Sequence, residues 1–157
     1  MLITRPSKPA RHGSAAVECA VVLILLMPLL LGTWEVGRLL QVQQLLQNAA
    51  REGGRQAATG RVNTAGVQQA VVNYLTNNGI TCSTTNVTVT NLTSAARPDP
   101  SNCNQLDEFQ VTVTIPFNSV RWVLLKQITP TTQLTASAYW YSMRDVPLTI
   151  NTNIPLQ

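Results

Sequence analysis

The first third of the chain is dominated by one apolar run. Residues 19–34 include no charged side chain, and the residues on either side are largely apolar as well. A run of this size is close to the roughly 17–25 residues that a membrane-spanning helix needs. On such a helix Glu18 and Glu35 lie roughly 25 Å apart, near the two faces of the hydrocarbon layer, and Trp34 falls at interfacial depth. The pattern predicts a single transmembrane helix.

Helical spacing continues beyond this span. Apolar or small residues recur on one side of a helix as far as residue 58: Val36, Leu39, Leu40, Leu46, Ala49, Ala50, Gly53 and Ala57. The stripe thins from leucine to alanine and glycine, and such small residues let another backbone approach closely. We therefore expect one helix that runs out of the membrane and ends near Gly60. A break at Gly53-Gly54 is the competing interpretation, because each glycine weakens a helix by about 1 kcal/mol relative to alanine.

The periodicity then changes. Residues 67–75 have helical spacing and stop at Asn77-Asn78-Gly79, a good helix end. Residues 86–92, 109–117 and 133–143 alternate between apolar and polar, which predicts half-buried strands. Residues 119–128 fit either a short helix or a strand, and residues 93–104 form a loop. The predicted fold is α+β: a long N-terminal transmembrane and amphipathic helix, a short second helix and a small antiparallel sheet.

Composition and charge argue against nucleic acid as a partner. Charged residues make up 11% of the chain, against about 25% in soluble domains. The net charge is +4, but Arg5, Lys8 and Arg11 precede the span and no basic cluster follows, whereas a nucleic-acid footprint is a concentrated patch. By the positive-inside rule these three residues place the N-terminus in the cytoplasm and the rest of the chain on the other side.

The cysteines agree with that orientation. Cys19 lies in the apolar run, where a thiol acts as a small hydrophobe. Cys82 and Cys103 lie in a polar, Thr- and Asn-rich region beyond the span. On the oxidising side of a bacterial membrane they are expected to form a disulfide, which is worth about 3 kcal/mol in the loop-closure account. A pair of free thiols is the alternative.

No pattern of catalytic or metal-binding residues stands out. The single histidine, His12, precedes the span, and the adjacent Asp107 and Glu108 point to opposite faces of a strand. No glycine-rich phosphate loop follows a predicted strand. We expect a protein that is not an enzyme and that needs no cofactor and no metal.

The N-terminal segment resembles a type IV prepilin. A short basic leader ends at Gly13, and Ser14-Ala15-Ala16-Val17-Glu18 and a long apolar helix follow. The resemblance implies that a prepilin peptidase cuts between Gly13 and Ser14 on the cytoplasmic side, which makes Glu18 the fifth residue of the mature chain. It also implies that Glu18 pairs with the terminal ammonium of a neighbouring subunit during assembly. The simpler interpretation is that Glu18 marks the membrane edge.

Pro28 lies mid-span. A proline at such a position kinks a helix or is tolerated without a kink.

The resemblance becomes more specific after the span, where the chain is similar to the TadE-like family of pseudopilins of the tight-adherence (Flp) pilus. Its acidic-x-Gly-Arg segment corresponds to Glu35, Gly37 and Arg38. Its second block corresponds to Asn48, Ala49, Ala50, Arg51, Glu52, Gly53 and Arg55.

The resemblance covers about the first 60 residues and implies a leader over residues 1–13. Together with the periodicity it predicts a helix over 14–60 and an extracytoplasmic α+β domain over 61–157. It implies a pilin-like, single-pass protein of the bacterial inner membrane, with a periplasmic domain, or one exposed outside the cell in the pilus. Its partners would be a prepilin peptidase, other pseudopilins or pilins, the Tad membrane platform and membrane lipid. The alternative is an uncleaved single-pass membrane protein whose outer domain binds a ligand or a partner.

Overall fold

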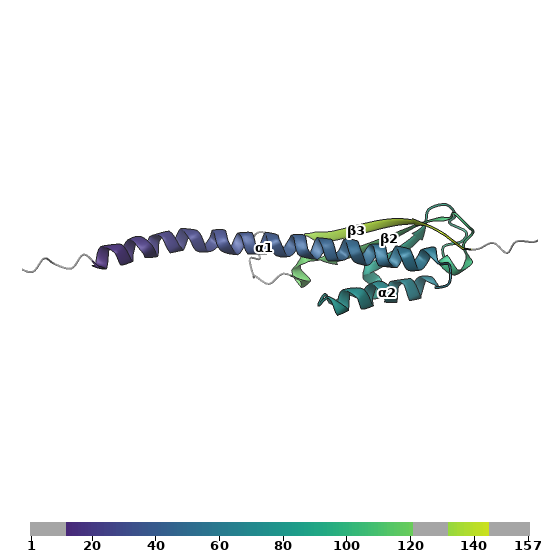
Figure 1. Ribbon diagram of the computed structural model, residues 1–157, viewed down its shortest axis with the longest axis horizontal. Coiled ribbons are helices and arrows are strands. Elements are labelled where there is room, and N and C mark those ends of the chain that lie inside the picture. The colour runs from purple at the N-terminus through teal and green to yellow at the C-terminus, as the bar shows by residue number, and fades with distance from the viewer. Residues whose placement is uncertain (1–11, 121–131, 145–157) are drawn as a thin grey trace, which may run out of the picture.

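One helix of 47 residues, α1 (His12–Ala58), forms the axis of the molecule. The computed structural model describes residues 12–120 and 132–144. The N-terminal half of α1 projects alone, and the remaining elements gather along its C-terminal half (Figure 1). The chain is therefore a rod with a folded head at one end, which confirms the predicted α+β class.

The projecting part of α1 is apolar and uncovered. It holds an 18-residue stretch with a mean hydropathy of 2.5, none of which is buried, so by length and composition this helix can cross a membrane. The helix continues through Pro28 and also through Gly53 and Gly54. The alternative of a break at the glycine pair is therefore wrong.

The second helix, α2 (Thr64–Asn77), ends where the sequence predicts and begins three residues before the expected segment 67–75. The Asn63 side chain accepts a hydrogen bond from the Gly66 N–H at 2.9 Å and so caps its N-terminus. Beyond its C-terminus Gly79 adopts a φ of +75°, a left-handed conformation that glycine tolerates. Val67, Val71 and Leu75, spaced four residues apart, form its buried face.

Three antiparallel strands follow in the order β1-β2-β3: β1 (Val87–Asn91), β2 (Glu108–Pro116) and β3 (Gln133–Tyr141). All three fall on predicted strands. In β2 burial alternates along its length, so one face is apolar and the other carries polar side chains. A short 3-10 turn, Phe117–Ser119, follows β2. Most of the ambiguous segment 119–128 lies outside the described residues.

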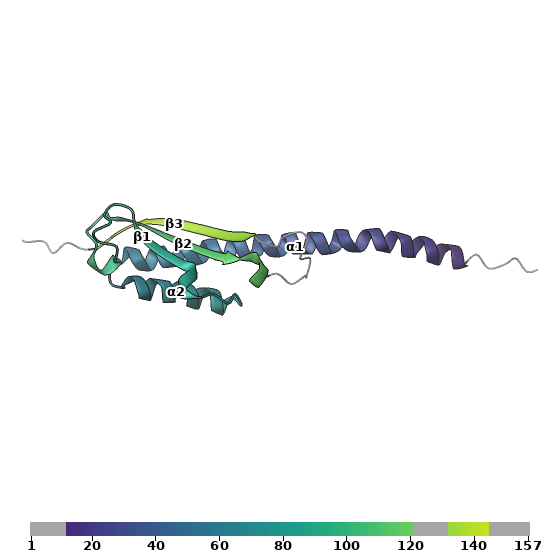
Figure 2. The same ribbon diagram turned by 180° about the vertical axis from the view of Figure 1, so that it is seen from behind.

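The head has two layers. The helices α1 and α2 form one layer and the sheet forms the other, as the two opposite views show (Figures 1 and 2). The core between them is built from the inner faces of all five elements, represented by Leu46, Ala50, Val71, Val87, Phe109, Val111 and Ala136.

The glycine pair lets α1 come close to both α2 and the sheet. A Cβ atom at Gly53 would lie 2.5 Å from Cγ2 of Val71 and 3.1 Å from Cγ1 of Val111, and a Cβ atom at Gly54 would overlap the indole ring of Trp140. The small-residue stripe therefore serves packing within the head.

Glutamine side chains from the helices cover both edges of the sheet. Gln43 and Gln47 of α1 donate hydrogen bonds to backbone carbonyls of β3, at 3.0 and 3.1 Å. Gln68 of α2 does the same to β1, at 2.9 Å to the Val87 carbonyl. Because an open strand edge invites pairing with other chains, these contacts restrict where another strand can add.

Replacing Gly54 by alanine tests the close approach of the layers. The added methyl group must displace Trp140, and overpacking of this kind costs typically about 1–3 kcal/mol. We expect Gly54→Ala to lower the midpoint of thermal unfolding, followed by circular dichroism of the full chain in detergent. Gly37→Ala is the matched control, because nothing lies within 4 Å of that position, and alanine should leave the midpoint unchanged or raise it. Equal midpoints for Gly54→Ala and the native chain would contradict the packing argument.

Candidate functional site

The predicted cleavage site lies at the free end of α1. The helix begins at His12, so the Gly13–Ser14 peptide bond is in its first turn, at the end farthest from the sheet (Figure 1). Nothing lies within 4 Å of a Cβ atom built at Gly13. Glu18 lies one turn further along and is exposed. The head therefore covers neither the bond nor the glutamate.

The span itself carries few polar groups. The Thr33 hydroxyl donates to the Leu29 carbonyl within the same helix at 2.9 Å. This bond satisfies the hydroxyl internally, as a lipid environment requires. Pro28 adjoins this turn without ending the helix, and the predicted kink stays a prediction.

The first part of the family motif lies where α1 meets the head. Glu35 is 7% exposed, and its two carboxylate oxygens have no hydrogen-bond partner within the described part of the chain. Arg38 donates through Nε to the Val120 carbonyl at 3.1 Å and through Nη1 to Gln41 at 3.0 Å. Gly37 is exposed between them. Arg38 thus links α1 to the backbone at Val120, after β2.

The second part of the motif faces two ways. Ala49, Ala50 and Gly53 are buried in the core, whereas Arg51 and Arg55 are exposed. One side of this block therefore builds the fold and the other presents charge to the surroundings.

Only one of these two arginines has an ion-pair partner within the motif. Arg55 pairs with Glu52 at 2.7 Å, and Gln56 also donates to Glu52 at 2.9 Å. The hydrogen bond from Arg55 lowers the pKa of Glu52, and the same bond raises the pKa of Arg55. An exposed pair of this kind contributes little to stability, so its effect is to fix the Arg55 side chain along the helix.

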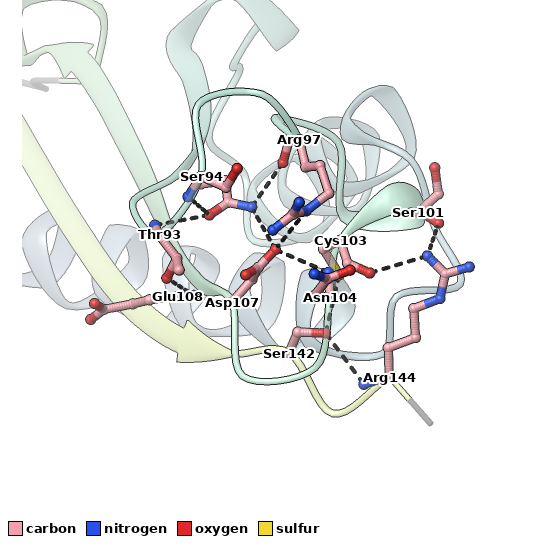
Figure 3. A network of polar contacts seen from close by, with 11 residues as sticks. Thr93, Ser94, Arg97, Ser101, Cys103, Asn104, Asp107, Glu108, Ser142 and Arg144 are labelled. Atoms are coloured by element: carbon pink, nitrogen blue, oxygen red, sulfur yellow. Dashed lines mark hydrogen bonds and ion pairs between the residues drawn. The ribbon is translucent and has the colours of Figure 1, made fainter. Parts of the chain in front are cut away.

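A buried carboxylate organises the loop between β1 and β2 (Figure 3). Asp107 is 3% exposed and accepts hydrogen bonds from the Asn104 N–H at 3.0 Å and the Asn91 amide at 3.1 Å. Nε of Arg97 lies 3.5 Å from the same oxygen. The hydrogen bond from the Asn104 N–H, followed by the one from Asn91 and by the nearby Arg97 guanidinium, holds the pKa of Asp107 below its usual value despite its burial. The loop is thus folded around one negative charge.

The predicted disulfide between Cys82 and Cys103 is wrong: both are free thiols. Cys82 precedes the Val87 end of β1, while Cys103 adjoins the network at the Asn91 end, so the roughly 13 Å length of this strand separates them. Sγ of Cys103 instead lies 3.1 Å from Oγ of Ser142. Burial raises the pKa of the Cys82 thiol.

The structure brings together no group of catalytic or metal-binding residues in the ranges that it describes. Within them, no three His, Cys, Asp or Glu residues lie close enough to hold a metal ion. Asp107 is turned into the loop network, whereas the neighbouring Glu108 is half-buried at the start of β2. The absence of enzymatic activity, of a cofactor and of a metal stays a prediction.

Some important side chains were not predicted from the sequence. Gln43, Gln47 and Gln68 had no recognised role, although the spacing of four residues between the first two is a signal that they share one helix face. The burial of Asp107 had no local signal, since its partners come from both ends of the loop.

The comparisons with known proteins gave a family match to the N-terminal part of the chain. The family model of the TadE-like protein matches residues 13–55. The match begins at Gly13 and ends at Arg55, so it covers the expected cleavage site, the span and both parts of the motif, and it confirms the resemblance there. The comparisons with curated proteins and with solved structures gave no match.

Replacing Asp107 by asparagine tests the loop network. Because the pKa of Asp107 is lower in the folded chain, the ionised group stabilises the fold above the unfolded value of about 3.9. That contribution is lost as the pH falls through the folded value. We expect Asp107→Asn to cost about 1.5–3 kcal/mol at pH 7, and the difference in unfolding midpoint from the native chain to shrink below about pH 4. The adjacent Glu108→Gln is the control and should change the midpoint little. A pH-independent difference for Asp107→Asn would contradict the role of the charge.

Alkylation tests the state of the cysteines. The chain, purified under oxidising conditions and unfolded without reductant, should react with iodoacetamide at all three cysteines, as read from the intact mass. Modification of a single cysteine before reduction, and of all three after it, would show that Cys82 and Cys103 form a disulfide. In the folded chain the half-buried Cys82 should react before the buried Cys103.

Proposed function

We propose that this chain, TadE-like over residues 13–55, is a pseudopilin that is cut after Gly13 and acts in the assembly of a Flp-type, tight-adherence pilus. The TadE-like segment suggests a Tad pilus-associated protein, and one long apolar N-terminal helix fits a single-pass membrane protein. The observation that carries the proposal is the family match itself, since its first residue is the glycine of the expected cleavage site.

The accessibility of the N-terminal end of α1 supports processing. A membrane peptidase must reach the Gly13–Ser14 bond from the cytoplasmic side, and the head lies at the opposite end of a 47-residue helix. In the proposed orientation Arg5, Lys8 and Arg11 stay in the cytoplasm and the head lies in the periplasm. Partners of the mature chain would be other pseudopilins or pilins, the Tad membrane platform and the surrounding lipid.

Glu18 supports a role in assembly after cleavage. Removal of the leader creates a positive α-amino group on Ser14, and Glu18 of a neighbouring subunit offers the opposite charge. In a low-dielectric helix bundle such a pair attracts strongly, while either charge left unpaired is costly. The exposure of Glu18 on α1 leaves it accessible to another subunit.

The intact mass and the N-terminal sequence of the chain purified from membranes test the proposal. With the host prepilin peptidase present, the mature chain should begin at Ser14; in a host without the peptidase it should begin at Met1. A large side chain in Gly13→Leu should block the cut, because the enzyme would have to accommodate it at the scissile bond. Glu35→Gln, which lies beyond the span, is the control and should be cut like the native chain.

The N-terminal sequence decides between a processed pseudopilin and an uncleaved membrane protein. A chain that begins at Met1 with or without the peptidase would contradict processing and favour the alternative, an uncleaved single-pass protein whose outer domain binds a ligand or partner. If the native chain is cut, Glu18→Gln separates the two proposed roles of this residue. Normal cutting together with lost association between chains in membranes would assign Glu18 to assembly, and unchanged association would contradict that role.

A further inference from the structure

We propose that Arg51 of α1 and the free edge of β3 at Tyr139 form a docking site for an extended segment of another protein that carries an aspartate or glutamate. A groove of about 300 Å³ lies between the helix and the strand there, lined by Gln47, Arg51 and residues 137–140. The site does not depend on the proposed cleavage, because it lies in the head, far from Gly13 (Figure 1).

The backbone N–H and C=O groups of Tyr139 point away from β2, toward the free edge of the sheet. The Ser142 N–H donates to the Asp107 carbonyl at 2.8 Å, and the Ser142 carbonyl accepts from the Leu106 N–H at 3.0 Å. Ser142 therefore bonds toward β2, and so do the even-numbered residues of β3, because the direction alternates along an antiparallel strand. The N–H and C=O groups of Thr135, Ser137 and Tyr139 point outward, toward the free edge.

The helix closes this edge only in part. Gln43 binds the Thr135 carbonyl and Gln47 binds the Ser137 carbonyl. Four helix residues advance about 6.0 Å and two strand residues about 6.6 Å, so the next facing pair is Arg51 and Tyr139. Arg51 has no hydrogen bond or ion pair to any residue in the described ranges. The row of helix-to-strand contacts stops at the groove.

The side chains at this point are of the kind that dominates protein interfaces. Tyr139 and Tyr141 are 57% and 56% exposed, and Trp140 between them is half-buried. The Tyr139 hydroxyl is held by the Gln110 amide at 2.9 Å, so its ring is already ordered. Arginine, tyrosine and tryptophan are enriched among the residues that carry most binding energy. An extended segment can pair with the outward backbone of Tyr139 while its carboxylate binds the planar guanidinium of Arg51.

Among the described residues, the charge requirement favours a different protein over a second copy. The described carboxylates of this chain lie in helix α1, in the loop network or in the central strand: Glu18, Glu35, Glu52, Asp99, Asp107 and Glu108. The other edge strand, β1, has none. Within the described ranges, a second copy thus has no strand edge that carries the required acid; Asp145 lies outside those ranges.

Nuclear magnetic resonance of the isotope-labelled full chain in detergent micelles tests the site with defined peptides. The probe is a blocked pentapeptide, acetyl-Thr-Val-Asp-Val-Thr-amide, which is extended and carries one carboxylate. Its addition should shift the amide signals of residues 137–141. The dissociation constant should rise about tenfold when the peptide carries Asn in place of Asp, and about tenfold for Arg51→Gln. A peptide with N-methylated backbone amides should not bind.

Arg55→Gln is the matched control, since Arg55 is also exposed, lies one turn further along α1 and is already paired with Glu52. It should bind the probe like the native chain. The proposal is overturned if the probe leaves residues 137–141 unperturbed, if Arg51→Gln binds as tightly as the native chain, or if N-methylation has no effect. Self-association in sedimentation experiments that depends on Arg51 without any peptide would overturn the choice of partner in favour of a second copy.

Discussion

The contact between the glycine pair of α1 and the layer of strands is the constraint on which the head depends. A helix and a sheet can pack this closely only if the helix has almost no side chains at the point of contact. Gly53 and Gly54 provide that point, where Val71, Val111 and Trp140 fill the space that larger residues would occupy. The loss in helix propensity, about 1 kcal/mol for each glycine, is thus offset by burial of the apolar groups around them. The same residues belong to the TadE-like segment, so part of its motif is explained by packing alone.

That explanation separates the motif into two sets of residues. Ala49, Ala50 and Gly53 face the core, and their small size is a requirement of the fold. Arg51 and Arg55 face outward and have no packing role, and Arg38 ties the helix to the backbone after β2. Motif residues that have no packing role are therefore candidates for a role in binding. Between the two arginines, the pairing of Arg55 with Glu52 leaves Arg51 as the one available to a partner.

The elements of this fold could be predicted because each has a strong local signal. The apolar run, the helical stripe and the alternation in β1, β2 and β3 are set by neighbouring residues, and the end of α2 follows from its Asn and Gly residues. The disulfide failed for the opposite reason, since the distance between Cys82 and Cys103 depends on which end of β1 each loop returns to. The Asp107 network and the glutamine contacts at the sheet edges also join residues far apart in the sequence. The spacing of Gln43 and Gln47 places them on one helix face, but no local pattern indicates which strands these side chains or Asp107 would meet.

The continuity of α1 has a mechanical consequence. The span and the axis of the head are one continuous helix, so a rotation or axial displacement of the helix after Pro28 also moves Arg51 and the edge of β3. One residue added to the helix between Trp34 and Arg38 would turn the head by about 100° about the helix axis and raise it by about 1.5 Å. The direction in which the head faces is therefore determined by the number of residues in α1 between Glu18 and the head.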